Sequence, residues 1–81
     1  MKAKVYVTLK SGILDPQGRA IQQSLVTLGF SSVNDVRVGK YLEVDLAEED
    51  PAQAESTVKA MCEKLLANPV IEEFRYDLNN S

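Results

Sequence analysis

Alternating apolar and polar positions at the start of the chain predict a strand over residues 3–10. Val5, Val7 and Leu9 fall on one face of this strand, and the residues between them fall on the other. The same alternation returns over residues 70–78. Both ends of the chain are therefore predicted to be half-buried strands.

Two further alternating runs lie in residues 36–46, on either side of Gly39-Lys40. The apolar positions of these runs are Val36, Val38, Leu42, Val44 and Leu46. A glycine between two alternating runs is typical of a tight turn. This segment therefore predicts two strands joined by a hairpin.

A first helix is predicted from Pro16 to Leu28. Its apolar positions recur at helical spacing, at Ile21, Leu25 and Leu28. Asp15 can accept the unpaired N–H groups of the first turn, and proline loses nothing at the first helical position. Gly29 is placed to end the helix in a left-handed conformation.

A second helix is predicted from Pro51, again after an aspartate. Gln53 stands three positions after Asp50, where the partner in a capping box would be, and Asn68-Pro69 ends the helix. The predicted apolar stripe comprises Ala54, Val58, Met61, Cys62 and Leu65.

The resulting order of elements is strand, helix, strand, strand, helix, strand. This order predicts an α+β, two-layer sandwich of the ferredoxin-like kind, with an antiparallel sheet and both helices on one face. The opposite face of the sheet would present a mixed surface suited to pairing with another subunit. Its expected members are Tyr6, Thr8, Tyr41, Glu43 and Arg75.

Length and composition predict a single domain over residues 1–81 that gains stability from association. The chain is 44% apolar and only 6% aromatic, and one core of this size contributes about 3–5 kcal/mol. A single cysteine excludes an internal disulfide. Oligomerisation is the expected supplement, and a dimer or a higher homo-oligomer is predicted.

Charge and hydropathy bear on nucleic-acid binding, membrane insertion and cellular location. The net charge of −3, without a basic stripe, opposes nucleic-acid binding. No long apolar run or charged-then-apolar leader occurs, so neither a membrane span nor secretion is expected. The expected location is the cytoplasm.

The residue types that carry catalysis are few. The chain has no histidine, Cys62 falls in the apolar stripe of the second helix, and Glu48-Glu49-Asp50 lacks the pattern of a calcium loop. The glycines do not follow a phosphate-loop spacing. We therefore expect no catalytic, cofactor-binding or metal-binding residues in this chain.

Four short pieces of the sequence stand out for their order and spacing. They are residues 14–18 (Leu-Asp-Pro-Gln-Gly), 28–30 (Leu-Gly-Phe), 36–40 (Val-Arg-Val-Gly-Lys) and 66–72 (Leu-Ala-Asn-Pro-Val-Ile-Glu). In these pieces the chain resembles the PurS family, the small subunit of phosphoribosylformylglycinamidine (FGAM) synthase. Together the four pieces span nearly the whole chain.

This resemblance implies a non-catalytic bridging subunit of a glutamine-dependent ligase in purine biosynthesis. The implied complex uses ATP, magnesium and glutamine to convert formylglycinamide ribonucleotide into the amidine. A large subunit (PurL) would bind ATP, magnesium and the ribonucleotide, and a glutaminase subunit (PurQ) would release ammonia. The chain itself would bind no cofactor and act as a dimer between them.

On this hypothesis two surfaces of the chain dock partner proteins. The first comprises Leu14, Asp15, Pro16, Gln17, Gly18 and Arg19, and the second comprises Arg37, Gly39 and Lys40. An alternative for Asp15, Pro16 and Gly18 is that they only form the turn.

Three other classes of protein share parts of this pattern. A small-molecule-binding regulatory module of the ACT type has the same order of elements and often dimerises. A stand-alone acylphosphatase would need an arginine-bearing anion loop after the first strand, and an RNA-binding sheet would need a Lys/Arg-Gly-Phe run. The sequence contains neither of these two features.

Overall fold

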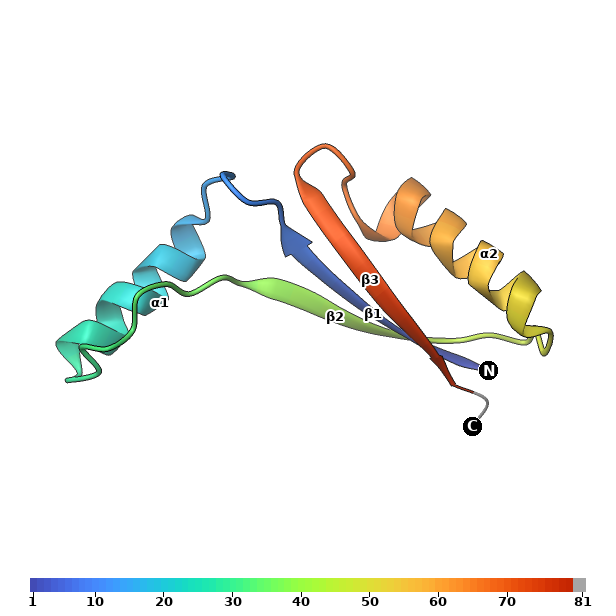
Figure 1. The fold of residues 1–81 in the computed structure, drawn as a ribbon, viewed down its shortest axis with the longest axis horizontal. Helices are drawn as coiled ribbons and strands as arrows, with labels where there is room; N and C mark the ends of the chain where they lie inside the picture. The colour runs from blue at the N-terminus through green and yellow to red at the C-terminus, as the bar shows by residue number, and fades with distance from the viewer. Residues whose placement is uncertain (80–81) are drawn as a thin grey trace.

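A three-stranded antiparallel sheet forms the centre of the fold in the computed structural model, which describes residues 1–79. Strand β1 (Lys2–Leu9) lies between β2 (Gly39–Asp45) and β3 (Glu72–Asn79) (Figure 1). Val5 in the middle of β1 pairs with Leu42 on one side and Tyr76 on the other. The α+β class, the antiparallel sheet and both terminal strands are therefore confirmed.

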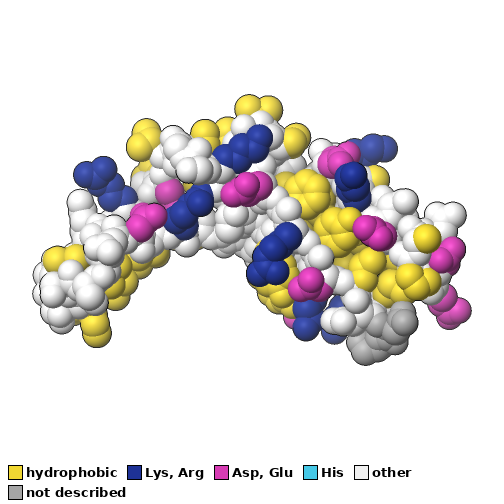
Figure 2. Space-filling view, in the orientation of Figure 1, with side chains coloured by type: hydrophobic (Ala, Val, Ile, Leu, Met, Phe, Trp, Pro, Cys, Tyr) yellow, Lys and Arg dark blue, Asp and Glu magenta, His cyan; other side chains and the backbone are white. Residues whose placement is uncertain are grey.

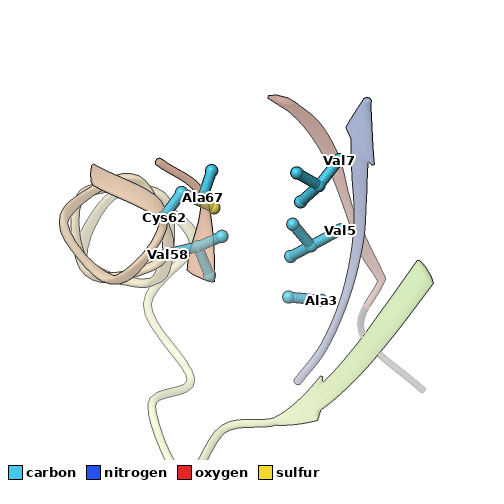
Figure 3. Close-up of a cluster of buried hydrophobic side chains, with 6 residues drawn as sticks. All are labelled: Ala3, Val5, Val7, Val58, Cys62 and Ala67. Atoms are coloured by element: carbon cyan, nitrogen blue, oxygen red, sulfur yellow. The ribbon is translucent and has the colours of Figure 1, made fainter. Parts of the chain in front are cut away.

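Helix α2 (Pro51–Met61) covers one face of this sheet and continues into the short π-helix η1 (Cys62–Leu66). The alternation of β1 points its small apolar side chains toward α2, where they meet a matching stripe (Figure 3). The buried cluster comprises Ala3, Val5, Val7, Val58, Cys62 and Ala67. Side chains of this size let the helix approach the sheet closely, but they bury little apolar area.

Residues 36–46 hold one strand and not the predicted hairpin. β2 begins at Gly39, opposite Thr8, and residues 33–38 lead into it without strand pairing. A Cβ atom on Gly39 would lie 2.4 Å from the Val7 carbonyl oxygen. The glycine therefore permits a close approach of two backbones, which is the other reason for a glycine in an alternating run.

Helix α1 (Pro16–Thr27) does not cover the sheet, and the prediction of two helices on one face is wrong for this helix. It lies beyond the end of β1, beside residues 33–38 and far from α2 (Figure 1). The buried cluster and the partly buried side chains around it include no α1 residue. The cause is local, because the first turn of α1 is tied to the segment just before β2.

The predicted helix ends are largely confirmed. Gly29 has φ +105° and its N–H donates to the Val26 carbonyl oxygen, while the Phe30 N–H donates to Leu25, as in a Schellman motif. At the second helix Asp50 accepts from the Ala52 N–H. The Asp50 N–H donates to Glu48 Oε1, so Glu48 takes the part predicted for Gln53.

The predicted stripe of the second helix is correct except at its end. Ala54, Val58 and Cys62 are fully buried, but Leu65 is 83% exposed, and Leu66 packs against the core in its place. The π-helical turn has more residues per turn than an α-helix. The next core-facing position therefore moves from 65 to 66.

No helix within residues 1–79 is long and apolar enough to cross a membrane.

Candidate docking surface

A groove of about 570 Å³ opens where α1 leaves the sheet. Three short segments form its walls: the loop after β1, the first turns of α1 and the chain leading into β2. The lining residues are 10–16, Arg19, Gln22, Gln23 and 34–37. This groove brings together parts of the chain that lie more than 20 residues apart.

Asp15 is the central hydrogen-bonding residue of this groove. Its Oδ1 accepts from the Gly18 N–H at 2.9 Å, and its Oδ2 accepts from the Val38 N–H at 2.9 Å. The hydrogen bonds from Val38 and then Gly18 lower the pKa of the Asp15 carboxyl, and the Arg37 guanidinium adds to this effect. Partial burial opposes them. The carboxylate is therefore ionised at neutral pH and joins two elements.

The groove carries charges of both signs beside apolar side chains. Lys10, Arg19 and Arg37 are its cationic residues, and Asp15 and Asp35 are its anionic ones. Leu14 at its rim is 82% exposed. Two arginines and an exposed apolar side chain within a polar surround agree with the arginine enrichment and polar rim of protein interfaces.

The structure brings five of the nine residues of the two predicted docking surfaces into one groove. Five of the predicted residues, Leu14, Asp15, Pro16, Arg19 and Arg37, line the same groove. Gly18 lies buried beneath it, and Gln17 is exposed on α1. Gly39 and Lys40 are the first residues of β2 and do not line it.

Nine lining residues of the groove were not predicted from the sequence, and the side chains of two of them make hydrogen bonds. Gln22 Nε2 donates to the Val33 carbonyl oxygen at 3.2 Å, and Lys10 Nζ donates to the Pro69 carbonyl oxygen at 2.6 Å. Gln22 stands one turn after Arg19, on the polar side of the predicted helix, and this spacing could have indicated it. The sequence has no signal for the Lys10 contact, which spans 59 positions.

The face of the sheet opposite α2 carries the mixed surface that the sequence predicts. Tyr6 lies at its centre, between Tyr41 on β2 and Arg75 on β3. The Tyr6 and Tyr41 ring centroids are 5.2 Å apart, and the Arg75 guanidinium carbon lies 4.0 Å from the Tyr6 centroid. These contacts form a row of π interactions across all three strands.

Two other side chains that could react, Cys62 and Tyr76, have raised pKa values. Burial raises the pKa of the Cys62 thiol, with a smaller effect from Glu63, which keeps the sulfur protonated in the core. Burial and then the nearby Glu55 raise the pKa of Tyr76, whose hydroxyl donates to Glu55. In the described part of the chain, no group of three acidic, histidine or cysteine residues could hold a metal ion.

The fold and the groove define a small α+β protein with an exposed groove of mixed charge beside its sheet. Comparison with known proteins identifies its family. The sequence model of the family PurS, phosphoribosylformylglycinamidine (FGAM) synthase, matches residues 2–80. The chain belongs to the PurS family.

Individual relatives agree with this assignment over almost their whole length. The PurS subunit of Bacillus subtilis is 51% identical over 77 residues, which cover 95% of this chain and 90% of that protein. The crystal structure of Methanocaldococcus jannaschii PurS is 40% identical, with a TM-score of 0.87 and coverage of 99% of this chain and 96% of that one. A solved structure of PurLQS from Thermotoga maritima matches with 33% identity and a TM-score of 0.86, covering 94% and 93%.

Proposed function

We propose that this chain is the PurS subunit of FGAM synthase, the glutamine-dependent ligase complex of purine biosynthesis. The observation that carries this proposal is the match to the PurS family over residues 2–80. Close identity to the PurS subunit of Bacillus subtilis supports it. The same match favours a complex subunit over a regulatory module of the ACT type.

The partners are the PurL and PurQ subunits, which the PurLQS structure from Thermotoga maritima names together with PurS. A bridging subunit has a chemical purpose in such a complex. Ammonia is a nucleophile, whereas ammonium has no free lone pair and dominates in neutral water. A chain that holds the ammonia-producing and ammonia-consuming subunits together shortens the exposure of ammonia to water. ATP, magnesium and glutamine then bind to the other subunits, and the complex works in the cytoplasm.

A second copy of the chain is a further partner, and the surface of a single protomer supports this. The accessible surface is 5819 Å², whereas a compact protein of this mass exposes about 4,800 Å². The radius of gyration is 16.1 Å, against about 12 Å for a compact chain of 81 residues. The excess surface is comparable to the roughly 800 Å² that one partner buries in a stable interface.

The groove at the start of α1 is the proposed docking surface for another subunit of the complex. Leu14, Asp15, Pro16, Arg19 and Arg37 line it, while Gln17 and Gly18 belong to the same turn of α1. Gly39 and Lys40 adjoin it through residues 37 and 38. Arginine is one of the residue types that are enriched among the side chains on which the stability of protein interfaces most depends.

Reconstitution of the complex tests this surface. We expect Arg19→Ala and Arg37→Ala each to weaken binding to PurL and PurQ by about tenfold, because arginine is enriched among the few interface residues whose truncation costs this much or more. Glutamine-dependent FGAM formation should fall with it. Lys59→Ala, on the exposed side of α2, is the matched control and should change neither. Wild-type binding and turnover in both arginine variants would remove the groove from the proposal.

A further inference from the structure

Two aspartates begin the two helices of this chain, and they are bonded differently. Asp50 accepts one backbone N–H with its side chain, from Ala52. Asp15 accepts two, from Gly18 within its own helix and from Val38, which is 23 positions away. The capping of a helix requires only a bond from an N–H group in its own first turn, such as those of Ala52 and Gly18. The second bond of Asp15 therefore serves another purpose.

Further contacts between α1 and residues 33–38 add to the bond between Asp15 and Val38. A Cβ atom on Gly18 would lie 2.2 Å from the Val36 carbonyl oxygen, so α1 and the chain before β2 touch backbone to backbone. One turn later, Gln22 donates to the Val33 carbonyl oxygen. These contacts join α1 to residues 33–38 as one unit, which we call the arm (residues 10–38).

The arm exposes apolar side chains that its own sheet does not cover. Leu28 is 73% exposed and Phe30 is 57% exposed, while Ile21 is 39% exposed. Hydrophobic side chains are visible along the surface of the arm, at the left of Figure 2. The excess accessible surface of the protomer matches the area that a second copy of the chain would bury.

We propose that Asp15 is a positioning residue for self-assembly. Its bond to Val38 fixes the direction in which the arm leaves the sheet, and a second copy of the chain binds the apolar side of α1 only when the arm has that direction. This inference rests on the proposed assembly of the chain as a dimer. The Asp15 side chain acts through the arm and does not itself have to touch the second copy.

Asp15→Ser and Asp15→Asn separate capping from positioning. Serine and asparagine are as good as aspartate at the start of a helix. Each offers only one side-chain oxygen, so neither can place a separate oxygen on each of the Gly18 and Val38 N–H groups as the carboxylate does. Asp50→Ser and Asp50→Asn are matched controls, because the Asp50 side chain makes only the capping bond. All four variants keep a capping residue, and only the two Asp15 variants lose the link to Val38.

Sedimentation equilibrium and amide hydrogen exchange of the full chain are the measurements. We expect the Asp15 variants to raise the dimer dissociation constant by about tenfold or more, since charge-assisted hydrogen bonds are among the strong ones. The Val38 amide should exchange faster, while helix content by circular dichroism stays unchanged. The Asp50 variants should leave both the dissociation constant and Val38 exchange unchanged.

Each contrary outcome has its own meaning. Faster Val38 exchange with an unchanged dissociation constant would overturn the positioning role and leave the dimer intact. Equal weakening by the Asp50 variants would show that helix capping alone matters, which also overturns the role of the Val38 bond. A wild-type chain that stays monomeric at all concentrations would overturn both this inference and the dimer on which it rests.

Discussion

Gly18 is the single residue that most tightly limits the sequence of α1. It occupies the third position of the helix, where alanine would be favoured by about 1 kcal/mol from helix propensity alone. A Cβ atom there would lie 2.2 Å from the Val36 carbonyl oxygen and 2.6 Å from Asp15 Oδ2. Neither neighbour can move freely, because one is backbone and the other is held by two hydrogen bonds.

We therefore predict that Gly18→Ala lowers the free energy of unfolding by about 1–3 kcal/mol, as overpacking usually does. Urea titration measures this change. Gln17→Ala, at the exposed neighbouring position, should stay within about 0.5 kcal/mol of the wild type. A stabilised Gly18→Ala variant would mean that helix propensity dominates and that the contact with Val36 is easily relieved.

The sequence is most informative at this scale when a residue acts on its near neighbours. Asp15 as a cap and Gly29 as a helix end could be predicted, because their partners lie within a few positions along the chain. The second bond of Asp15 could not be predicted, because Val38 comes near only after the chain folds back. Gln53 shows a limit even for local rules, since Glu48, on the other side of Asp50 in the sequence, supplies the side-chain oxygen that accepts from the Asp50 N–H.

Among the elements, the junction between α2 and η1 decides which leucine is in the core. Spacing in the sequence favours Leu65, whereas the π-helical turn presents Leu66 to the sheet and leaves Leu65 83% exposed. A single extra residue in the turn is enough for this exchange, and composition gives no sign of it. Along the chain, the bounds of the other predicted strands and helices agree well with the structure, apart from the hairpin expected at Gly39.

Alanine substitutions at these two leucines test the register of η1. We predict that Leu66→Ala lowers the free energy of unfolding by about 1–3 kcal/mol, because it removes partly buried apolar volume from the core. Leu65→Ala should change it by no more than about 0.5 kcal/mol. Urea titration of both variants measures the difference. The reverse order of effects would show that the helix continues with α-helical spacing through residue 65.

At the scale of the whole molecule, the protomer is an incomplete unit. The core contains few large side chains, and α1 adds nothing to it. The need for a partner could be predicted from length, composition and the lack of a disulfide. The position of α1 could not, because its apolar stripe is equally suited to the chain's own sheet or to another chain, and the spacing of residues does not distinguish the two.

We predict that the thermal midpoint of unfolding rises with protein concentration, by about 4 °C for each tenfold increase, as expected for a dimer of this size. Differential scanning calorimetry over a hundredfold range of concentration measures it. Association stabilises the folded chain by mass action, so a monomer would show a constant midpoint. A constant midpoint would mean that the arm is stable without a second copy.

The elongated form of the protomer, with principal extents of 49 × 28 × 14 Å, affects how its mass should be determined. A gel-filtration column sorts molecules by hydrodynamic radius, and a long, flat chain elutes earlier than a sphere of equal mass. Calibration against round standards would therefore assign a lone chain more than its own mass. Light scattering at the column outlet, which reports mass without reference to form, avoids this error.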